Sequence, residues 1–220
     1  MGQLLALRTY HIKEKDFTLK AVPNMATANL AAIVSIDEFV SSLRKFSARS
    51  FETTPEILGF LKKHPVRAET LDPFLCWDRQ HYTRNLIDKT ELYELIAICW
   101  EVGQNSSIHN HAQQNCWMAA PIGRLLVQNY RTVAEDVDAG TCDLKASDVV
   151  EMNAGNPVAV NPLEPVHRVF NPPDFRKRAV SLHVYSRPYD QCVVYSEERH
   201  TCGTIKLSYT TEFGKASDAH

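Results

Sequence analysis

The chain has 220 residues, of which 44% are hydrophobic and 23% are charged, and this is the composition of an ordinary globular domain. Its 24 lysine and arginine residues against 26 aspartate and glutamate residues give a net charge of −2, without the basic excess that neutralises nucleic-acid phosphates. Unbroken apolar runs such as residues 30–34 and 95–100 are too short to cross a bilayer. We therefore expect a single globular domain, with at most a small appendage, that binds neither nucleic acid nor membrane.

The N-terminus carries no targeting pattern. The apolar stretch 4–7 is too short for a secretory signal, and Ala6 stands where a myristoylation signal has serine or threonine. The six cysteines form no C-x-x-C pair, which leaves zinc fingers and thioredoxin-like motifs without support. We expect a cytoplasmic protein whose cysteines stay reduced.

Residues 1–34 show no sustained period and are interpreted as a loosely ordered leader. A capping box follows, because Ser35 can cap an amide of the first helical turn and Glu38 can cap back. Apolar side chains then recur at helical spacing, which predicts a helix over residues 36–49.

A second helix is predicted to start at Thr54, as the N-cap, with Pro55 at its first position. A third, short helix is predicted over residues 70–77, although Pro73 interrupts it. Together these segments predict a small helical cap over residues 35–78.

Short apolar or alternating runs, separated by Gly, Pro, Asn and Asp, fill the rest of the chain. They are residues 82–87, 93–100, 116–119, 124–130, 149–152, 158–160, 166–170, 179–185, 191–196 and 204–210. Many short strands with frequent turns and no helical period between them favour a β-sandwich or β-barrel. The sequence thus predicts a mainly β protein whose barrel spans about residues 79–213, in one domain with its helical cap from residue 35.

Histidine placement points to a metal site. His109 and His111 stand two residues apart, so in a strand both side chains point to one face and can approach one ion. His167, inside another strand-like run, is the natural third ligand. Three neutral imidazoles leave coordination positions open, as a catalytic metal requires. Hydrogen-bonded core histidines and a zinc site are the alternatives to this interpretation.

Two motifs around these histidines resemble the cupin motifs, with Cys116 in the place of the usual acidic ligand. The matching residues are Gly103, His109, His111, Cys116 and Gly123 in the first motif and Gly155, Pro162, His167 and Asn171 in the second. Over residues 82–214 the chain is similar to the thiol dioxygenases, and specifically to the cysteine dioxygenase family. The segments that carry this similarity are residues 82–86, 99–100, 106–111, 167–169 and 180–185, together with Cys116.

The resemblance implies a cupin-type double-sheet, jelly-roll-like barrel and an enzyme that incorporates both atoms of O₂. It implies ferrous iron held by His109, His111 and His167, and conversion of free L-cysteine to L-cysteine sulfinate. Cysteine catabolism and taurine biosynthesis are the implied setting, and a monomer is expected. An imidazole set contributes no charge, which suits a substrate whose own thiolate is the anionic, soft ligand.

The resemblance also assigns roles to further residues. It implies that Arg84 binds the substrate carboxylate through its planar guanidinium, with Tyr82 on the same face. Cys116 and Tyr185 match the positions of a cysteine–tyrosine thioether crosslink. His183 is expected to orient Tyr185, in a buried relay with Ser181 at alternate strand positions.

One departure from the family pattern is Arg187, which stands where a proline is usual after Tyr185 and Ser186. We expect a trans Ser186–Arg187 peptide bond and a second contact to the substrate carboxylate from Arg187. Such a contact leaves 3-mercaptopropionate open as the substrate in place of cysteine. A non-catalytic metal-binding cupin module is a further alternative, as is a dioxygenase for N-terminal cysteines of proteins. Arg84 argues against the last, because a peptide lacks the free carboxylate.

Overall fold

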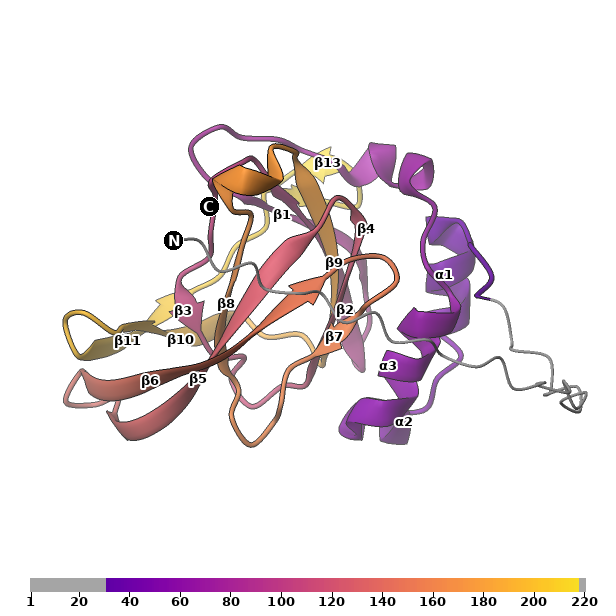
Figure 1. The fold of residues 1–220 in the computed structure, drawn as a ribbon. Helices are drawn as coiled ribbons and strands as arrows, with labels where there is room; N and C mark the ends of the chain where they lie inside the picture. The colour runs from indigo at the N-terminus through magenta and orange to yellow at the C-terminus, as the bar shows by residue number, and fades with distance from the viewer. Residues whose placement is uncertain (1–30, 218–220) are drawn as a thin grey trace, which may run out of the picture. The chain divides into compact units, whose positions relative to one another are not determined.

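The structure is a computed structural model of the chain, and it describes residues 31–217. Its helical part consists of short elements packed on one side of a β-barrel (Figure 1). These elements are α1 (Ile36–Leu43), α2 (Ala48–Glu52), α3 (Thr54–Lys63) and the 3₁₀ helix η1 (Ala68–Phe74). Among the described residues, no helix has the length and hydropathy that a bilayer crossing requires.

The capping box is confirmed, but the single helix predicted over residues 36–49 is wrong. Ser35 Oγ accepts from the Glu38 amide and the Glu38 side chain accepts from the Ser35 amide. The helix ends at Leu43, where tighter i→i−3 bonds close its last turn, and Ser47 adopts the extended conformation of an N-cap and starts α2. Apolar spacing continues across this break, so periodicity alone did not reveal it.

The second and third predicted helices are each shifted. α3 begins at Thr54 with Thr53 as its N-cap, one residue earlier than expected. The third helix is a 3₁₀ helix over Ala68–Phe74 and not a helix over residues 70–77, because Pro73 cannot donate to a continued α-helical ladder. Most of the predicted leader lies outside the described residues, but Val34 forms a parallel bridge with Val66 and so attaches its last residues to the cap.

The larger sheet has seven strands in the order β13-β12-β1-β2-β9-β4-β7. Its strands are β13 (Lys215–Ala216), β12 (Thr211–Glu212), β1 (Thr83–Lys89), β2 (Tyr93–Trp100), β9 (Ala179–Ser186), β4 (Cys116–Ile122) and β7 (Val158–Ala159). Every residue of β2 and β9 is buried, because one face of the sheet packs on the helices and the other faces the barrel interior.

The second sheet closes on itself in the order β10-β11-β6-β5-β8-β3, with β3 pairing both β8 and β10. Its strands are β10 (Gln191–Ser196), β11 (Thr201–Lys206), β6 (Thr141–Met152), β5 (Leu125–Asp136), β8 (Val166–Phe170) and β3 (Ile108–His109), and the 3₁₀ turn η2 (Pro173–Phe175) follows β8. The predicted double-sheet barrel of cupin type with a helical cap is confirmed.

Several strand bounds differ from the prediction. β5 and β6 form a hairpin in which β5 continues past residue 130 and β6 begins well before residue 149. The side chains of these extensions are mostly polar and exposed, so an apolar pattern cannot reveal them. β11 begins at Thr201, three residues before the predicted strand, and ends at Lys206.

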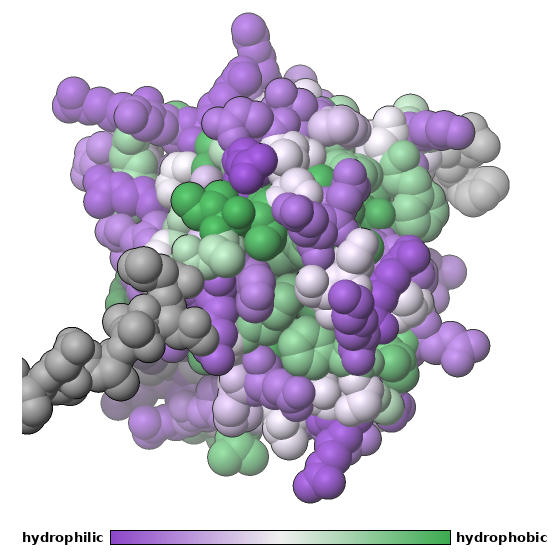
Figure 2. Space-filling view, turned by 90° about the vertical axis from the view of Figure 1, so that its right-hand side faces the viewer, coloured by the Kyte–Doolittle hydropathy of each residue, from purple (hydrophilic) through white to green (hydrophobic). Residues whose placement is uncertain are grey.

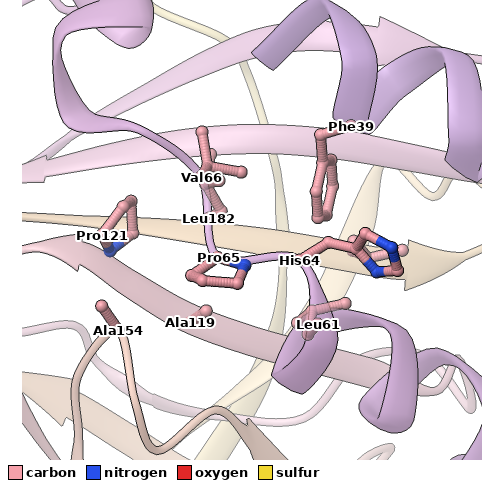
Figure 3. Close-up of a pocket in the computed structure, with 10 residues that line it drawn as sticks. Phe39, Leu61, His64, Pro65, Val66, Ala119, Pro121, Ala154 and Leu182 are labelled. Carbon is pink, nitrogen blue, oxygen red and sulfur yellow. The ribbon is translucent and has the colours of Figure 1, made fainter. Parts of the chain in front are cut away.

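Alternate side chains of β2 pack into two different hydrophobic clusters. Leu95, Ala97 and Cys99 pack towards the helices, whereas Ile96 and Ile98 belong to the cluster inside the barrel. Where the cap meets the sheet, His64, Pro65 and Val66 lie opposite Ala119 and Leu182 around a cavity of about 10 Å³ (Figure 3). This space holds one water at most. The cap side of the surface is mainly hydrophilic, with apolar side chains in separate patches (Figure 2).

Candidate metal centre

Three histidines converge inside the second sheet. His109 of β3 is the register partner of His167 of β8, and His111 follows two residues after His109. One nitrogen from each ring lies within 4.8 Å of the others. The three ring centroids are 4.7, 4.8 and 5.2 Å apart. The predicted convergence of the three side chains is therefore present.

Hydrogen bonds leave a free nitrogen on each ring. His109 Nδ1 donates to the Ser107 carbonyl at 2.9 Å, and His167 Nδ1 donates to the Pro165 carbonyl at 3.3 Å. Nε2 of both rings is then unprotonated. Nε2 of His167 and both ring nitrogens of His111 are buried without any hydrogen-bond partner. Buried nitrogens of this kind are costly unless a ligand takes their lone pairs, so the three residues fit a metal ion.

Burial keeps these imidazoles neutral. It lowers the pKa of His109 to about 4 and the pKa of His111 and His167 well below the usual range. Neutral rings are the form that ligates metals.

The local fold at His111 differs from the continuous strand that was expected. β3 has only two residues, and Asn110 anchors the segment that follows it: its side chain accepts from the amides of Ala112 and Val193 and donates to the Tyr195 hydroxyl. Ala112 and Gln113 then adopt left-handed conformations that turn the chain. His111 reaches the site from a loop held by these bonds.

A buried chain of hydrogen bonds connects Trp100 to Tyr185. Trp100 Nε1 donates to Ser181 Oγ at 2.9 Å, Ser181 Oγ lies 2.8 Å from His183 Nε2, and His183 Nδ1 lies 3.0 Å from the Tyr185 hydroxyl. The indole can only donate, so Ser181 accepts from it, and with the ring proton of His183 on Nδ1 the Ser181 hydroxyl donates to His183 Nε2. His183 Nδ1 then donates to Tyr185, whose own O–H stays available.

Burial holds the relay in this state. It lowers the pKa of His183 to about 3, so the ring carries one proton, and it raises the pKa of Tyr185 well above its usual range, so the phenol is neutral.

Cys116 and Tyr185 are register partners on β4 and β9 and share one face of the sheet. Both residues are buried, and the Tyr185 ring centroid lies 5.2 Å from that of His111. Cys116 is a free thiol in the structure, and burial raises its pKa well above the usual value. The pair predicted for the crosslink is thus adjacent and next to the histidines.

Arg84 enters the site from β1. It is half-buried, its Nε is sealed from solvent without a partner, and it forms no ion pair at contact distance among residues 31–217. Burial lowers the pKa of Arg84, but the phenols of Tyr185 and Tyr189 and the Glu94 carboxylate raise it more. Tyr82, just before β1, stacks on Trp100 with ring centroids 4.8 Å apart. A guanidinium that no carboxylate of the described residues contacts can accept an anionic ligand.

Three residues that sequence analysis missed surround Arg84. Tyr189 stacks edge-on against Tyr185 with centroids 5.1 Å apart, and Glu94 accepts a hydrogen bond from the Tyr209 hydroxyl. Glu94 could have been noticed as the one charged residue in the apolar run of β2. Tyr189 and Tyr209 lie in loops and carry no comparable signal.

Arg187 does not supply the expected second contact. Its side chain is exposed and lines a surface pocket with Glu52 and Gln114, apart from the histidines. All peptide bonds of the described residues are trans, including Ser186–Arg187 as expected. Arg187 has a φ of 68°, which turns the chain so that Tyr189 is the residue directed to the site.

Comparison with known proteins gives a consistent family. A family model described as "Cysteine dioxygenase type I" matches residues 25–198. The proteins named "Cysteine dioxygenase type 1" of Danio rerio and Rattus norvegicus are 22% and 28% identical, over 82% of this chain and 89% and 88% of theirs. Two solved structures, a protein with a double-stranded beta-helix domain from Klebsiella pneumoniae and TT1209 from Thermus thermophilus, each have a TM-score of 0.41 at 14% identity. They cover 53% of this chain and are themselves covered to 86% and 93%.

The protein is a cupin-type double-sheet barrel with a three-histidine site that can hold a metal ion. The family match then extends over most of the sequence, from the helical cap through β10. The chain belongs to the cysteine dioxygenase type I family, and it is a dioxygenase.

Proposed function

We propose that the protein uses ferrous iron and O₂ to convert free L-cysteine to L-cysteine sulfinate. The observation that supports this most is the combination of three converging histidines with free ring nitrogens and an arginine that makes no ion pair at contact distance, in the same barrel. The first group suits a metal with open positions and the second suits a carboxylate, so together they fit a small thiol acid. We place this activity in the cytoplasm, in cysteine catabolism leading to taurine, and expect a monomer.

His109, His111 and His167 would hold the iron. When bound, ferrous iron supplies a redox-active centre with open positions at which O₂ is activated. The backbone carbonyls of Ser107 and Pro165 contribute by fixing the ring tautomers, which keeps the metal-facing nitrogens free of protons.

Arg84 and Tyr82 would bind the carboxylate of the substrate. A planar guanidinium forms two parallel bonds with a carboxylate and so fixes the orientation of the thiol as well as its position. The indole of Trp100, which is 1% exposed and stacked on Tyr82, excludes water from this side. Low local polarity strengthens the ion pair with Arg84.

Tyr185 would donate a hydrogen bond to the substrate or to O₂, with His183 as its positioning residue. The relay supports this role because, with the His183 proton on Nδ1, it ends on the phenol oxygen and leaves the phenol hydrogen unused. A thioether from Cys116 Sγ to the Tyr185 ring would fix the phenol further. Forming that bond removes two hydrogen atoms, and O₂ is the oxidant that would take them up.

The test compares metals on the same protein. Apoprotein loaded anaerobically with Fe(II) or with Zn(II) is mixed with O₂ and with L-cysteine, 3-mercaptopropionate or a peptide with N-terminal cysteine. We expect cysteine sulfinate from the iron form with free cysteine, and none from the zinc form. Absence of O₂ consumption by the iron form with either free thiol acid would contradict the proposal. Faster turnover of 3-mercaptopropionate would identify that thiol as the substrate.

A further inference from the structure

Glu94 is a buried carboxylate on the interior side of β2 that the proposed chemistry does not use. The residues that alternate with it, Ile96 and Ile98, belong to the cluster inside the barrel, and Glu94 itself is 0% exposed. It is the register partner of Tyr185, which is in turn the register partner of Cys116 on the next strand. The carboxylate therefore stands in the same row as the residues proposed for the crosslink.

Tyr209 holds Glu94 and also lies next to Arg84. Its hydroxyl donates to Glu94 Oε2, and the guanidinium carbon of Arg84 lies 6.0 Å from the Tyr209 ring centroid. The segment is fixed to β1 because the Thr210 amide donates to the Arg84 carbonyl at 2.7 Å. One tyrosine ring thus connects the carboxylate with the arginine proposed to bind substrate.

The second oxygen of Glu94 has no partner. Oε1 is sealed from solvent and makes no hydrogen bond, which is costly for a buried carboxylate. Burial raises the pKa of Glu94 above its usual value, and the Tyr209 hydroxyl and the positive charges of Arg84 and Lys89 offset part of that rise. Glu94 is the carboxylate that raises the pKa of Arg84, beside the phenols of Tyr185 and Tyr189.

We propose that Glu94 is a specificity-determining residue that acts through Arg84, as an internal counter-charge that makes the pocket favour thiols carrying an amine over purely anionic thiols. This inference rests on the proposed function, and it concerns which thiol the same site selects. A negative charge beside Arg84 opposes the approach of a substrate carboxylate. It stabilises the N–H groups of an amine, whose hydrogens are positively polarised, and 3-mercaptopropionate has no such group.

The test measures kcat/KM for 3-mercaptopropionate, L-cysteine and cysteamine, which are an anion, a zwitterion and a cation at neutral pH. Glu94→Gln keeps the shape and the acceptor for Tyr209 and removes the charge. We expect the ratio of kcat/KM for 3-mercaptopropionate to that for cysteamine to rise about tenfold, which corresponds to about 1.4 kcal/mol. The value for cysteine relative to cysteamine should rise by the same factor or less.

Two variants separate charge from packing. Glu91→Gln makes the same change of net charge at an exposed position just before β2, and it should leave the ratio unchanged. Glu94→Asp keeps the charge and should stay within about twofold of the wild-type ratio. A change of less than twofold in Glu94→Gln, a fall of the ratio, or the same rise in Glu94→Asp would overturn the proposal.

Failure of the proposed function has a different signature. If the iron-loaded wild type oxidises none of the three thiols, the proposed activity is wrong, and calorimetric affinities of 3-mercaptopropionate and cysteamine for wild type and Glu94→Gln then test the counter-charge by the same ratio. If Glu94→Gln does not fold, Tyr209→Phe is measured instead, because losing the hydroxyl donor destabilises the ionised form of the Glu94 carboxylate. It should move the ratio in the same direction by a smaller factor, and no change or a fall would contradict the proposal.

Discussion

Direction matters in the hydrogen-bond chain that ends on Tyr185. Trp100 can only donate, which fixes the first bond, and the His183 tautomer with its proton on Nδ1 directs the other two towards Tyr185 and leaves the phenol hydrogen free to reach the site. A chain of this kind positions a donor and keeps it neutral at physiological pH. No residue of the relay is more than 3% exposed, so water cannot substitute for a missing member.

Removing the Tyr185 hydroxyl should therefore lower turnover more than binding. We expect Tyr185→Phe to reduce kcat about a hundredfold, the cost of losing one positioned donor, with little change in KM. Tyr130→Phe, at a buried phenol in a separate cluster, is the matched control. Steady-state kinetics with L-cysteine measure both, and an unchanged kcat in Tyr185→Phe would remove Tyr185 from the mechanism.

Replacing Arg84 by lysine keeps the charge and loses the planar fork. We expect Arg84→Lys to raise KM for L-cysteine roughly tenfold, because one charge-assisted bond is lost. KM for cysteamine, which has no carboxylate, should not change. Arg124→Lys alters an exposed arginine and should affect neither thiol. Equal effects of Arg84→Lys on both thiols would show that Arg84 does not bind the carboxylate.

At the scale of elements, strands of both sheets and one loop bring the site together. β2, β9 and β4 align Glu94, Tyr185 and Cys116 in one row through their register, and the loop after β3 carries His111. The arrangement depends on the larger sheet keeping its register, and the cap contributes to that by packing on its outer face.

The contact between α1 and β1 is a point where the contribution of the cap to stability can be measured. Asp88, which is 3% exposed, accepts two bonds from Arg44 and one from the Tyr93 hydroxyl. Asp88→Asn should lower the free energy of unfolding by about 1–3 kcal/mol, the cost of a broken buried bond to a charged group. Its kcat should not change at a temperature where the variant is folded. Denaturant unfolding of Asp88→Asn and of the exposed-site control Asp37→Asn checks this, and equal stabilities would be the contrary result.

Sequence analysis located the elements whose patterns are local and missed those set by distant contacts. β2, β8 and β10 have the predicted bounds because apolar or alternating runs mark buried strands directly. The relay was found because spacing along β9 places Ser181, His183 and Tyr185 on one face. The three histidines were found although His111 reaches the site from a loop and not from the expected strand. Glu94, Tyr189 and Tyr209 meet Arg84 only through β2, a loop and the C-terminal segment, and no local pattern encodes such a meeting. Arg187 was assigned to the pocket from its position in the chain, and its left-handed backbone turns it away.

For the whole molecule, four neutral histidines with lowered pKa values make folding depend on pH. Burial lowers the pKa of His109 to about 4 and of His183 to about 3, and it lowers the pKa of His111 and His167 as well. These groups bind protons more readily in the unfolded chain, where their pKa is near 6.5. Stability is therefore fully present above that value and is lost as pH falls towards the folded-state pKa values.

We expect the free energy of unfolding of the metal-free protein to fall between pH 6.5 and pH 4.5. The limiting slope is about 1.4 kcal/mol per pH unit for each such histidine. Guanidinium unfolding at several pH values measures the slope. His183→Gln should reduce the slope of the free energy of unfolding against pH by the contribution of one histidine. A stability that does not change across this range would mean that the rings are not buried as described.

The whole account depends on the chain being a dioxygenase at the three-histidine centre. Its most direct test is the reaction of the iron-loaded protein with L-cysteine under isotopically labelled dioxygen, followed by mass spectrometry of the product. The account predicts cysteine sulfinate in which both added oxygen atoms carry the label, and no such product from a His167→Ala variant. Incorporation of a single labelled atom, or labelled sulfinate formed equally well without His167, would contradict it.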